Sequence, residues 1–529
     1  MKLVSYFQNL GLFTKSFLLL IVLFFVYGLG IHFFDCVLPI HEWRKTDSLS
    51  FALNYEKGAS FFSPETNFIS DAGNRNAAAE FPIIYYFIGN IWRIFGHFDW
   101  IAKLISIATL FTSISLFSKV TNHFFRNQTK TLLFAGIMFS SPVLIYYSDT
   151  LLPNVYSFAF LLFASYFLFR FFTEHKNIFL ACFGLFLTLA LLIKITVLIA
   201  VLSFSGAAFF YFLIHEKNLF SRHLKSFLTL LSVFLIAVFA TYFWYTYAIE
   251  YNSKHHSVIF STTIRPIWEV DAARRKEIWD IIWKYQLDML FHHYAMIPCL
   301  IVVVVLTIKK KVAPYLLWII GIGLIGIFAY FILWFWVFDV HDYYLIEILF
   351  FPLVLIFIVI NYTSTVLKSK ALVVSASALF FGIIVLHAVS YTQLAFGKDN
   401  IITKNTFLVS QFVKGNWGYF HWHHGDHLKR LQDQTLEIQK IIGEKDTVLC
   451  LTDPSPNIQL YTINRIGFTS QNFPSNIDRV LRINQLCEKG TDYLLLIGPE
   501  AIDSSLMIFT KKEVYSKNNV RVYDLKGFK

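Results

Sequence analysis

The sequence predicts an α-helical polytopic membrane protein that ends in a small α/β domain. Three observations predict this fold class. Of the 529 residues, 56% are hydrophobic and only 15% are charged, and the mean hydropathy is +0.56, whereas soluble domains carry about a quarter charged residues. Apolar runs long enough to cross a bilayer recur between residues 17 and 391. Beyond residue 391, short apolar runs alternate with polar ones, as in a soluble domain.

The membrane part begins with an apolar run at 17–40. This run is too long for the core of a signal peptide and has no clear small-residue cleavage site, so we expect a retained membrane anchor. A spanning helix needs about 20 mostly apolar residues, and by this criterion about eleven spans are predicted. They lie at 17–40, 101–119, 131–149, 155–173, 178–193, 196–214, 226–248, 292–308, 315–336, 344–361 and 371–391.

The loops between these spans predict the topology. With a cytoplasmic N-terminus, the loops rich in Lys and Arg all fall inside: 119–130, 170–176, 217–225, 309–311 and 368–370. The short loops at 149–154 and 338–342 fall outside and are acidic or neutral, as the positive-inside rule requires. The rule also favours two helices across 178–214, because a single helix would invert everything downstream. The cytoplasmic (inner) membrane is the expected location, with the C-terminal tail outside the cytoplasm.

Two further segments are predicted to be helices at the membrane surface. Residues 81–95 are apolar and rich in aromatic residues but are interrupted by Asn90 and Arg93, which favours a helix at the interface. Residues 267–290 place apolar side chains among charged ones, which predicts an amphipathic helix lying on the membrane.

The tail, residues 392–529, is predicted to be an extracytoplasmic α/β domain. We expect a helix at 427–443, a buried strand at 447–453, a helix after the DPSPN turn, a helix at 477–490 and a second strand at 492–498. The alternation of strand and helix favours a partly parallel sheet. The tail has no phosphate-binding glycine loop, so acceptor binding or packing is the expected role.

Composition argues against several classes of function. The net charge of +11 comes mostly from Lys and Arg in short loops, with no basic stripe, so nucleic acid is not an expected partner. The five cysteines show no CxxC spacing, which argues against metal or redox use and implies no disulfide framework. The cluster HWHHGDH at 421–427 has metal-binding residue types, but four histidines in a polar linker are weak evidence. No cofactor is expected, and a divalent metal is possible without being indicated.

The predicted outer loop, residues 41–80, is dense in ionisable groups beside an apolar sequence. Such groups are costly next to a bilayer unless they face water, a partner or a substrate, so the loop is a candidate site. The alternative is a solvated loop whose charges only set topology. The ionisable residues are His41, Glu42, Arg44, Lys45, Asp47, Glu56, Glu65, Asp71, Arg75 and Glu80.

Other polar residues are predicted to face the same side of the membrane. Lys194 is the only charge in an apolar hairpin and is either functional or snorkelling to the interface. The predicted outer loops add Asp149, Asn154, His341, Asp342, Tyr343 and Tyr344. If these features converge with the first loop, they form an outward-facing polar cavity.

Five segments carry a resemblance to the GT-C glycosyltransferases, in the branch of glycosyltransferase family 39 that includes protein O-mannosyltransferases and the lipid A aminoarabinose transferase. The segments are WRKTDSLSFALNYEKG (43–58), AEFPIIYYFIGNIWRIFG (79–96), SPVLIYYSDTLLPN (141–154), LALLIKIT (189–196) and HDYYLIEILFFP (341–352). Bacterial members show WRQTD-like, EFP or EKPP, and HxYY-like segments at these places. Here Asp47 follows Arg44, Phe81 stands where the lipid A enzymes have Lys, and Asn154 stands for a usual Asp.

The resemblance implies a GT-C fold for residues 1–391 and an inverting transfer from a polyprenyl-phosphate sugar to a lipid, glycan or protein acceptor. Asp47 would be the base, with Glu80 orienting the loop or binding the acceptor. Arg44, beside Asp47, should keep that carboxylate ionised. The substrate-binding candidates are Glu42, Arg44, Lys194, His341 and Tyr344, with Arg44, Lys194 and His341 placed to hold the donor phosphate.

Two other classes of function fit part of the sequence. A transporter or flippase for a lipid-linked or anionic substrate would also have about eleven spans, but no inverted repeat or paired Gly/Pro-broken helices are apparent. A membrane scaffold that displays the tail would explain neither Lys194 nor the first loop.

Overall fold

The computed structural model describes residues 9–35, 40–215, 224–257, 259–260, 264–366, 369–398, 400–405, 407–421, 426–473, 478–498 and 506–528. The chain forms two compact units, each assembled from three separate stretches. The first, here called the membrane unit, comprises Met1–Phe33, Lys103–Trp244 and Thr263–Gly415. The second, the loop–tail unit, comprises Phe34–Ala102, Tyr245–Thr262 and Asn416–Lys529. The outer loop and the tail therefore belong to the same compact unit. The domain boundaries expected from the sequence, 1–391 and 392–529, stay a prediction.

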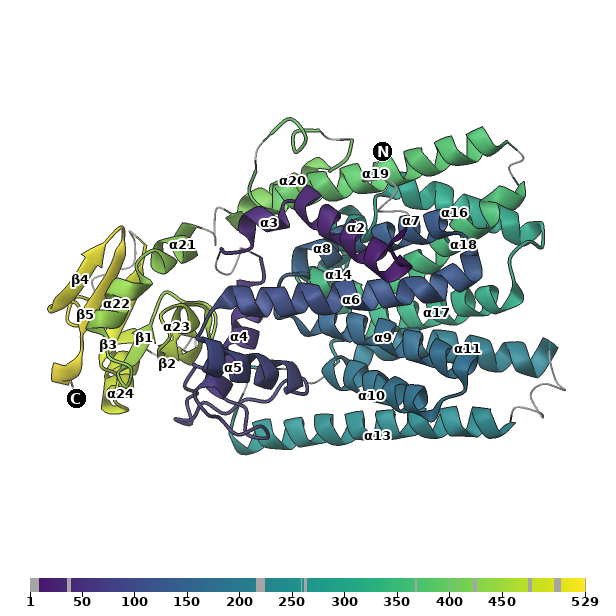
Figure 1. Cartoon of the computed structure of the whole chain (residues 1–529). Coiled ribbons are helices and arrows are strands. Elements are labelled where there is room, and N and C mark those ends of the chain that lie inside the picture. Colours follow the sequence, from purple (N-terminus) through teal and green to yellow (C-terminus); the bar gives the residue numbers. More distant parts are fainter. Residues whose placement is uncertain are drawn as a thin grey trace. The chain divides into compact units, whose positions relative to one another are not determined.

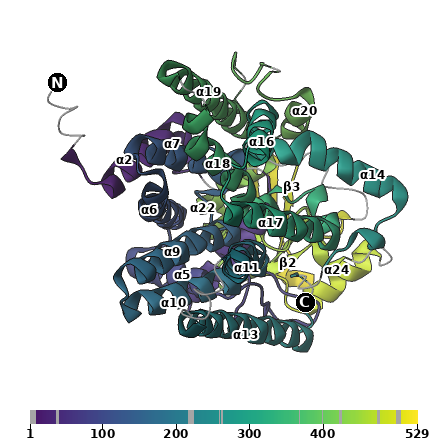
Figure 2. The same ribbon diagram turned by 90° about the vertical axis from the view of Figure 1, so that its right-hand side faces the viewer.

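The membrane unit is helical. Its long helices, among them α6, α9, α11 and α17, run side by side in Figure 1, and Figure 2 shows α11 nearly end-on. Within it, α9 packs against α10, and α11 packs against α17. The helices that lie wholly or, for α6, α13 and α20, partly in this unit are α2 (Leu12–Val26), α3 (Leu29–His32), α6 (Asp99–Phe125), α7 (Gln128–Phe139), α8 (Pro142–Tyr147), α9 (Pro153–Glu174), α10 (Asn177–Ile193), α11 (Leu198–His215), α13 (Leu224–Lys254), α14 (Ala272–Ile281), α15 (Leu287–Leu290), α16 (His293–Ile308), α17 (Pro314–Leu333), α18 (Phe350–Val366), α19 (Lys370–Ala395) and α20 (Gln411–Phe420).

Five of the described helices are long and apolar enough to cross a membrane, and two bent pairs raise this number to seven. Shorter apolar helices, such as α2 and α10, lie in other predicted spans. Each of the predicted ranges contains helix, but the expected number of eleven spans is not confirmed. The prediction of two helices across 178–214 is confirmed by α10 and α11.

Two predicted spans are broken for reasons visible in the backbone. The helix expected at 17–40 ends at Val26, because Gly28 adopts a left-handed conformation (φ +82°) that ends helices. The span expected at 131–149 is divided between α7 and α8. Pro142 begins the second helix, and Ser141 before it is extended, as residues preceding proline usually are.

The segment 267–290 is helical, as predicted, but not uniform. It comprises η2 (Ile267–Glu269), α14, a π-helical turn η3 (Ile282–Gln286) and α15. Ile278 and Ile282 are buried, whereas the side chains of Trp268 and Trp283 are exposed. This division of faces fits an amphipathic helix, and its position on a membrane stays a prediction.

The loop–tail unit contains a five-stranded sheet in the order β2-β1-β3-β5-β4. β1 is parallel to β2 and β3, and β5 is antiparallel to β3 and β4, which confirms the partly parallel sheet. The strands β2, β4 and β5 were not predicted, and the helix expected at 427–443 is divided in two. The strands are β1 (Thr447–Cys450), β2 (Ile466–Thr469), β3 (Tyr493–Ile497), β4 (Glu513–Lys517) and β5 (Val520–Asp524); the tail helices are α21 (Asp426–Gln432), α22 (Thr435–Ile441), α23 (Ile458–Thr462) and α24 (Arg479–Glu488).

Part of the outer loop is helical, which corrects the prediction of a loop over 41–80. Residues 42–56 form α4 (Glu42–Glu56), which packs against α5 (Ile83–Phe95), the helix predicted at 81–95 (Figure 1). Gly89 makes this close packing possible, because a Cβ there would lie 2.5 Å from the backbone oxygen of Ala52. Although α4 begins with polar residues, it has a buried apolar face that includes Phe51 and Leu53.

The rest of the outer loop extends the tail's sheet at β2. Ile69 donates its N–H to the carbonyl of Gly467 at 2.7 Å, and Gly467 donates to the carbonyl of Asn67 at 3.0 Å. Phe68 is buried in the apolar core on one face of the sheet with Val448 and Leu495. The first loop and the tail are thus one folded body, which places residues of the two stretches side by side.

Candidate functional site

The first polar cluster lies at the start of α4. Arg44 and Asp47 are one helical turn apart and therefore share a face of the helix. The Arg44 guanidinium donates to Glu80 at 2.6 Å, and both side chains are mostly buried. Arg44 Nη2 also lies 3.4 Å from the Tyr85 hydroxyl of α5. The structure thus brings together three predicted site residues, Arg44, Asp47 and Glu80, around the junction of α4 and α5.

The tail contributes a residue to this cluster. Asn457 Nδ2 donates to Asp47 Oδ1 at 2.7 Å. Asn457 stands at the end of the DPSPN turn, where it precedes α23. The sequence had marked this turn only as the start of a helix. Its proline-flanked asparagine was the available signal, but nothing in the sequence indicated a contact with a residue 410 positions away.

Asp47 titrates near neutrality. The carboxyl group is 2% exposed, and burial raises its pKa to about 7. Arg44 and the hydrogen bond from Asn457 lower the pKa, whereas the charges of Asp453 and Glu80 raise it. Arg44 does lower the pKa of Asp47, but burial raises it by more. The prediction that Arg44 keeps Asp47 ionised is therefore wrong, because the cost of desolvation outweighs one nearby cation. A carboxyl group with a pKa near 7 is suited to exchange protons at physiological pH.

Glu42 occupies the first position of α4 and is buried. It follows His41, whose backbone is left-handed (φ +60°). Its backbone carbonyl accepts a hydrogen bond from Thr46 at 2.7 Å. Glu42 thus lies one helical turn before Thr46.

The second polar cluster belongs to the membrane unit. Lys194 stands in extended conformation (φ −151°, ψ 103°) between α10 and the 3-10 helix η1 (Ile195–Val197). Its ammonium lies 4.3 Å from the centroid of the Tyr344 ring, and the residue is only 8% exposed. The His341 ring lies 6.1 Å from that of Tyr344. A buried ammonium against an aromatic face is a cation–π contact rather than a lysine extended into water.

Buried carboxylates surround this part of the membrane unit. Tyr344 belongs to η5 (Asp342–Ile348), which also carries Asp342 and Glu347. Asp342 accepts hydrogen bonds from Tyr147 and from Tyr285, and Asn154 donates to Glu347 at 2.6 Å. Glu347 was missed in the sequence, although its place in HDYYLIE was a signal. Asp149 lies 4.0 Å from Lys103, which is also buried.

Comparison with known proteins relates part of the sequence to a family and the whole fold to a solved structure. Residues 79–245 match the model of the family described as dolichyl-phosphate-mannose-protein mannosyltransferase. The structure of ArnT from Cupriavidus metallidurans in the apo state matches with a TM-score of 0.52 and 11% identity, over 96% of this chain and 97% of that chain. This chain therefore shares the fold of ArnT, and its residues 79–245 are similar to the mannosyltransferase family.

A second structure of ArnT from Cupriavidus metallidurans, bound to undecaprenyl phosphate, matches this chain with a TM-score of 0.52 and 10% identity, over 96% of this chain and 97% of that chain. A search of curated protein sequences gives no significant match. The fold expected from the sequence motifs is thus confirmed, and the chain is a multi-pass membrane protein.

The candidate site residues of the chain are divided between its two units. Glu42, Arg44, Asp47 and Glu80 belong to the loop–tail unit, and Lys194, His341 and Tyr344 belong to the membrane unit. Within each unit the structure brings most of the predicted residues into contact. The convergence of the two sets on one cavity stays a prediction.

Metal-binding side chains are not gathered in the described part of the chain. Among those residues, no group of three or more His, Cys, Asp or Glu could hold a metal ion. The cluster HWHHGDH at 421–427 lies largely outside the described residues, since these omit 422–425.

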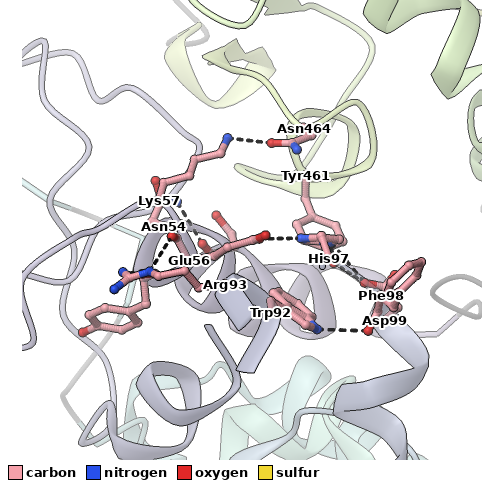
Figure 3. Close-up of polar contacts among 12 residues, drawn as sticks. Asn54, Glu56, Lys57, Trp92, Arg93, His97, Phe98, Asp99, Tyr461 and Asn464 are labelled. Atoms are coloured by element: carbon pink, nitrogen blue, oxygen red, sulfur yellow. Dashed lines mark hydrogen bonds and ion pairs between the residues drawn. The ribbon is translucent and has the colours of Figure 1, made fainter. Parts of the chain in front are cut away.

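A third polar cluster, not anticipated from the sequence, joins the end of α5 to the tail (Figure 3). His97 Nδ1 lies 2.8 Å from Glu56, and His97 Nε2 lies 3.2 Å from the Tyr461 hydroxyl of α23. Tyr461 also donates to Asp99. Burial lowers the pKa of His97, but hydrogen bonds to Asp99 and Glu56 outweigh this effect and raise the pKa to about 9. The imidazolium therefore links α4 and α6 to the tail through ionic hydrogen bonds.

Proposed function

We propose that the protein transfers a sugar from a polyprenyl-phosphate donor to a lipid, glycan or protein acceptor, with inversion at the anomeric carbon. The observation that carries this proposal is the buried carboxyl of Asp47, with a pKa of about 7, between an Arg–Glu pair and a tail asparagine. The undecaprenyl phosphate bound to the similar ArnT structure supports a polyprenyl-phosphate donor. The matched family and both matched structures are transferases, which favours transfer over transport.

Asp47 acts as the general base in this proposal. The acceptor hydroxyl attacks the anomeric carbon as the bond from that carbon to the phosphate oxygen breaks, through an oxocarbenium-like state. Asp47 takes the hydroxyl proton, and polyprenyl phosphate leaves with the electron pair of the broken bond. Proton transfer to a positioned base contributes about 10²–10⁴-fold to the rate. A pKa of about 7 lets Asp47 accept that proton at neutral pH and return it to water.

The departing phosphate requires cations. Lys194 is the main candidate, because its ammonium is held against the Tyr344 ring and is shielded from water. Buried cations stabilise a developing phosphate charge far better than exposed ones. Arg44 and His341 are further candidates for phosphate contacts. Side chains alone suffice for one phosphate, so the proposed reaction requires no metal.

Glu80 and Glu42 have supporting roles in the proposal. Glu80 holds the Arg44 guanidinium through a short ion pair, which fixes the direction of the Arg44 side chain and orients the loop. Glu80 is also proposed to bind the acceptor. Glu42 lies at the buried start of the same helix and is assigned a weaker substrate contact.

The reaction is proposed to take place on the outer face of the cytoplasmic membrane. The distribution of Lys and Arg among the short loops supports this topology, with the N-terminus inside and both the loop and the tail outside. The loop and the tail fold together, which requires them to be on the same side of the membrane.

The test is a transfer assay with purified protein, a polyprenyl-phosphate sugar and a membrane extract as acceptor. Wild-type protein should release polyprenyl phosphate and label an acceptor, and Asp47→Asn should do neither while binding donor normally. In cells, deleting the gene and comparing surface glycolipids and glycoproteins by mass spectrometry should reveal the acceptor. Donor turnover that survives in Asp47→Asn would remove Asp47 from the role of base.

A further inference from the structure

The tail reaches the candidate base through a single turn. The segment Asp453–Asn457 connects β1 to α23, and α23 packs against α4. The contact to Asp47 is made by Asn457 Nδ2, at 2.7 Å from the carboxylate oxygen. Both residues are almost fully buried. The hydrogen bond is therefore shielded from water, where a bond to a charged group is strong.

The direction of the Asn457 amide is fixed by its other contacts. Its oxygen accepts hydrogen bonds from the backbone N–H of Phe68 and from the Ser50 hydroxyl, each at 3.2 Å. Rotating the amide would place its nitrogen against the Phe68 N–H, which is a donor, and its oxygen against Asp47. The network therefore assigns the nitrogen to the side of Asp47.

The turn itself is held on both sides. Asp453 is buried and accepts hydrogen bonds from the backbone N–H of Gln459 at 2.6 Å and of Ser455 at 2.9 Å, which closes the turn before α23. At the other end of α23, Tyr461 is held by His97 and Asp99 (Figure 3). Asn457 thus stands on a helix that is fixed at both ends, as a residue that orients another group must be.

We propose that the tail completes the acid–base site and that Asn457 is a positioning residue, which orients the Asp47 carboxylate and stabilises its ionised form. This inference rests on the proposed function for its catalytic meaning. The role is new for the tail, to which the sequence assigned only acceptor binding or packing.

The electrostatics around Asp47 set the direction of the effect. The charged groups that act on it are Arg44 on its own helix, Glu80 before α5 and Asp453 in the tail turn. The two carboxylates raise the pKa of Asp47, whereas Arg44 and Asn457 lower it. Removing the Asn457 amide therefore raises the pKa and leaves more Asp47 protonated at neutral pH.

A pair of matched variants isolates this effect. Asn457→Leu removes the amide at nearly constant volume. Asn67→Leu makes the same change at a buried amide that also joins loop to tail: Asn67 accepts from Ser50 at 2.7 Å and donates to the Arg465 carbonyl at 2.9 Å. Asn67 does not hydrogen-bond Asp47. If either leucine variant fails to fold, Asn457→Ser and Asn67→Ser give the same comparison.

Two readouts are needed. Infrared titration of the purified protein follows the carboxyl band that Asp47→Asn removes, and it does not depend on turnover. In Asn457→Leu this band should titrate about one to two pH units higher, the shift expected for losing one charge-assisted hydrogen bond. The acidic limb of kcat/KM should move by the same amount, so activity at pH 7 falls about five- to fifty-fold and recovers at alkaline pH.

The outcomes separate the inference from the proposed function. Asn67→Leu should titrate like wild type in both readouts. An unshifted Asp47 band in Asn457→Leu, or an equal shift in Asn67→Leu, would overturn the role of Asn457 even if transfer is intact. Absence of transfer by wild type with every polyprenyl-phosphate sugar would overturn the proposed function, whereas the infrared shift alone would still support Asn457 as the group that holds Asp47.

Discussion

Replacing Asp47 by asparagine should stabilise the folded protein above neutral pH while it abolishes transfer. Burial raises the pKa of Asp47 from the ordinary value of 3.8 to about 7. The folded state therefore binds the Asp47 proton more tightly than the unfolded state, and its stability falls as the pH rises from about 4 to 7. Each pKa unit corresponds to about 1.36 kcal/mol. The shift amounts to an upper bound of about 4 kcal/mol of lost stability at pH 8.

Asparagine is neutral at every pH and does not carry this cost. The oxygen of its amide still accepts the hydrogen bond from Asn457, since Oδ1 of Asp47 accepts it in the wild type. We therefore expect Asp47→Asn to unfold at a higher temperature than wild type at pH 8, and at a similar temperature at pH 5. Transfer should fall by at least about 10²–10⁴-fold because no base remains.

Thermal unfolding in lipid nanodiscs at pH 5 and pH 8 measures the first effect, and the transfer assay measures the second. Asp433→Asn, which removes an exposed carboxylate of the tail, is the control and should show neither effect. An Asp47→Asn protein that is less stable than wild type at pH 8 would refute the reasoning, because the ionised carboxylate would then stabilise the fold.

Four other outcomes are expected. Lys194→Met should lower donor turnover by about 10²-fold with little change in protein abundance; normal donor affinity and turnover would leave Lys194 a packing residue. Glu80→Gln should move the acidic limb of the pH profile downwards, because the Glu80 charge raises the pKa of Asp47, and should reduce transfer partially at pH 7. Glu42→Gln should reduce it less, and a larger loss than in Glu80→Gln would reverse their roles. A reporter fused after Lys529 should be active only if it requires export, and cytoplasmic reporter activity would contradict the topology.

The apolar pattern was enough to predict the helices, because burial in lipid demands long apolar runs. The breaks within these predicted helices were harder to recognise in the sequence. Gly28 follows the end of one helix and Pro142 begins another, each through its backbone conformation, within runs that remain apolar in composition. The strands β1 and β3 have strongly apolar centres and were predicted, whereas β4 (EVYSK) is half-exposed at an edge and resembles a polar loop.

The sequence predicted those parts of the candidate site that are formed by residues close together along the chain. Arg44 and Asp47 share one helical face, and His341 and Tyr344 share one loop. Asn457 and His97 were not predictable, because their partners are far away along the chain. The pairing of Phe68 with the sheet at Gly467 joins the loop to the tail, and a bridge of this kind has no signature in a single sequence.

The pKa of Asp47 could not be predicted from the spacing of charged residues in the sequence alone. Arg44 is one helical turn from Asp47, but its guanidinium is held by Glu80 at 2.6 Å, so the positive charge is largely compensated by a carboxylate. Asp47 therefore faces an ion pair rather than a lone cation, with a second carboxylate, Asp453, in the tail turn. Against that nearly neutral surrounding, the cost of removing Asp47 from water dominates and the pKa rises. The same compensation gives the site a base near neutral pH, because an Arg44 without Glu80 would hold Asp47 ionised and make it a weaker proton acceptor.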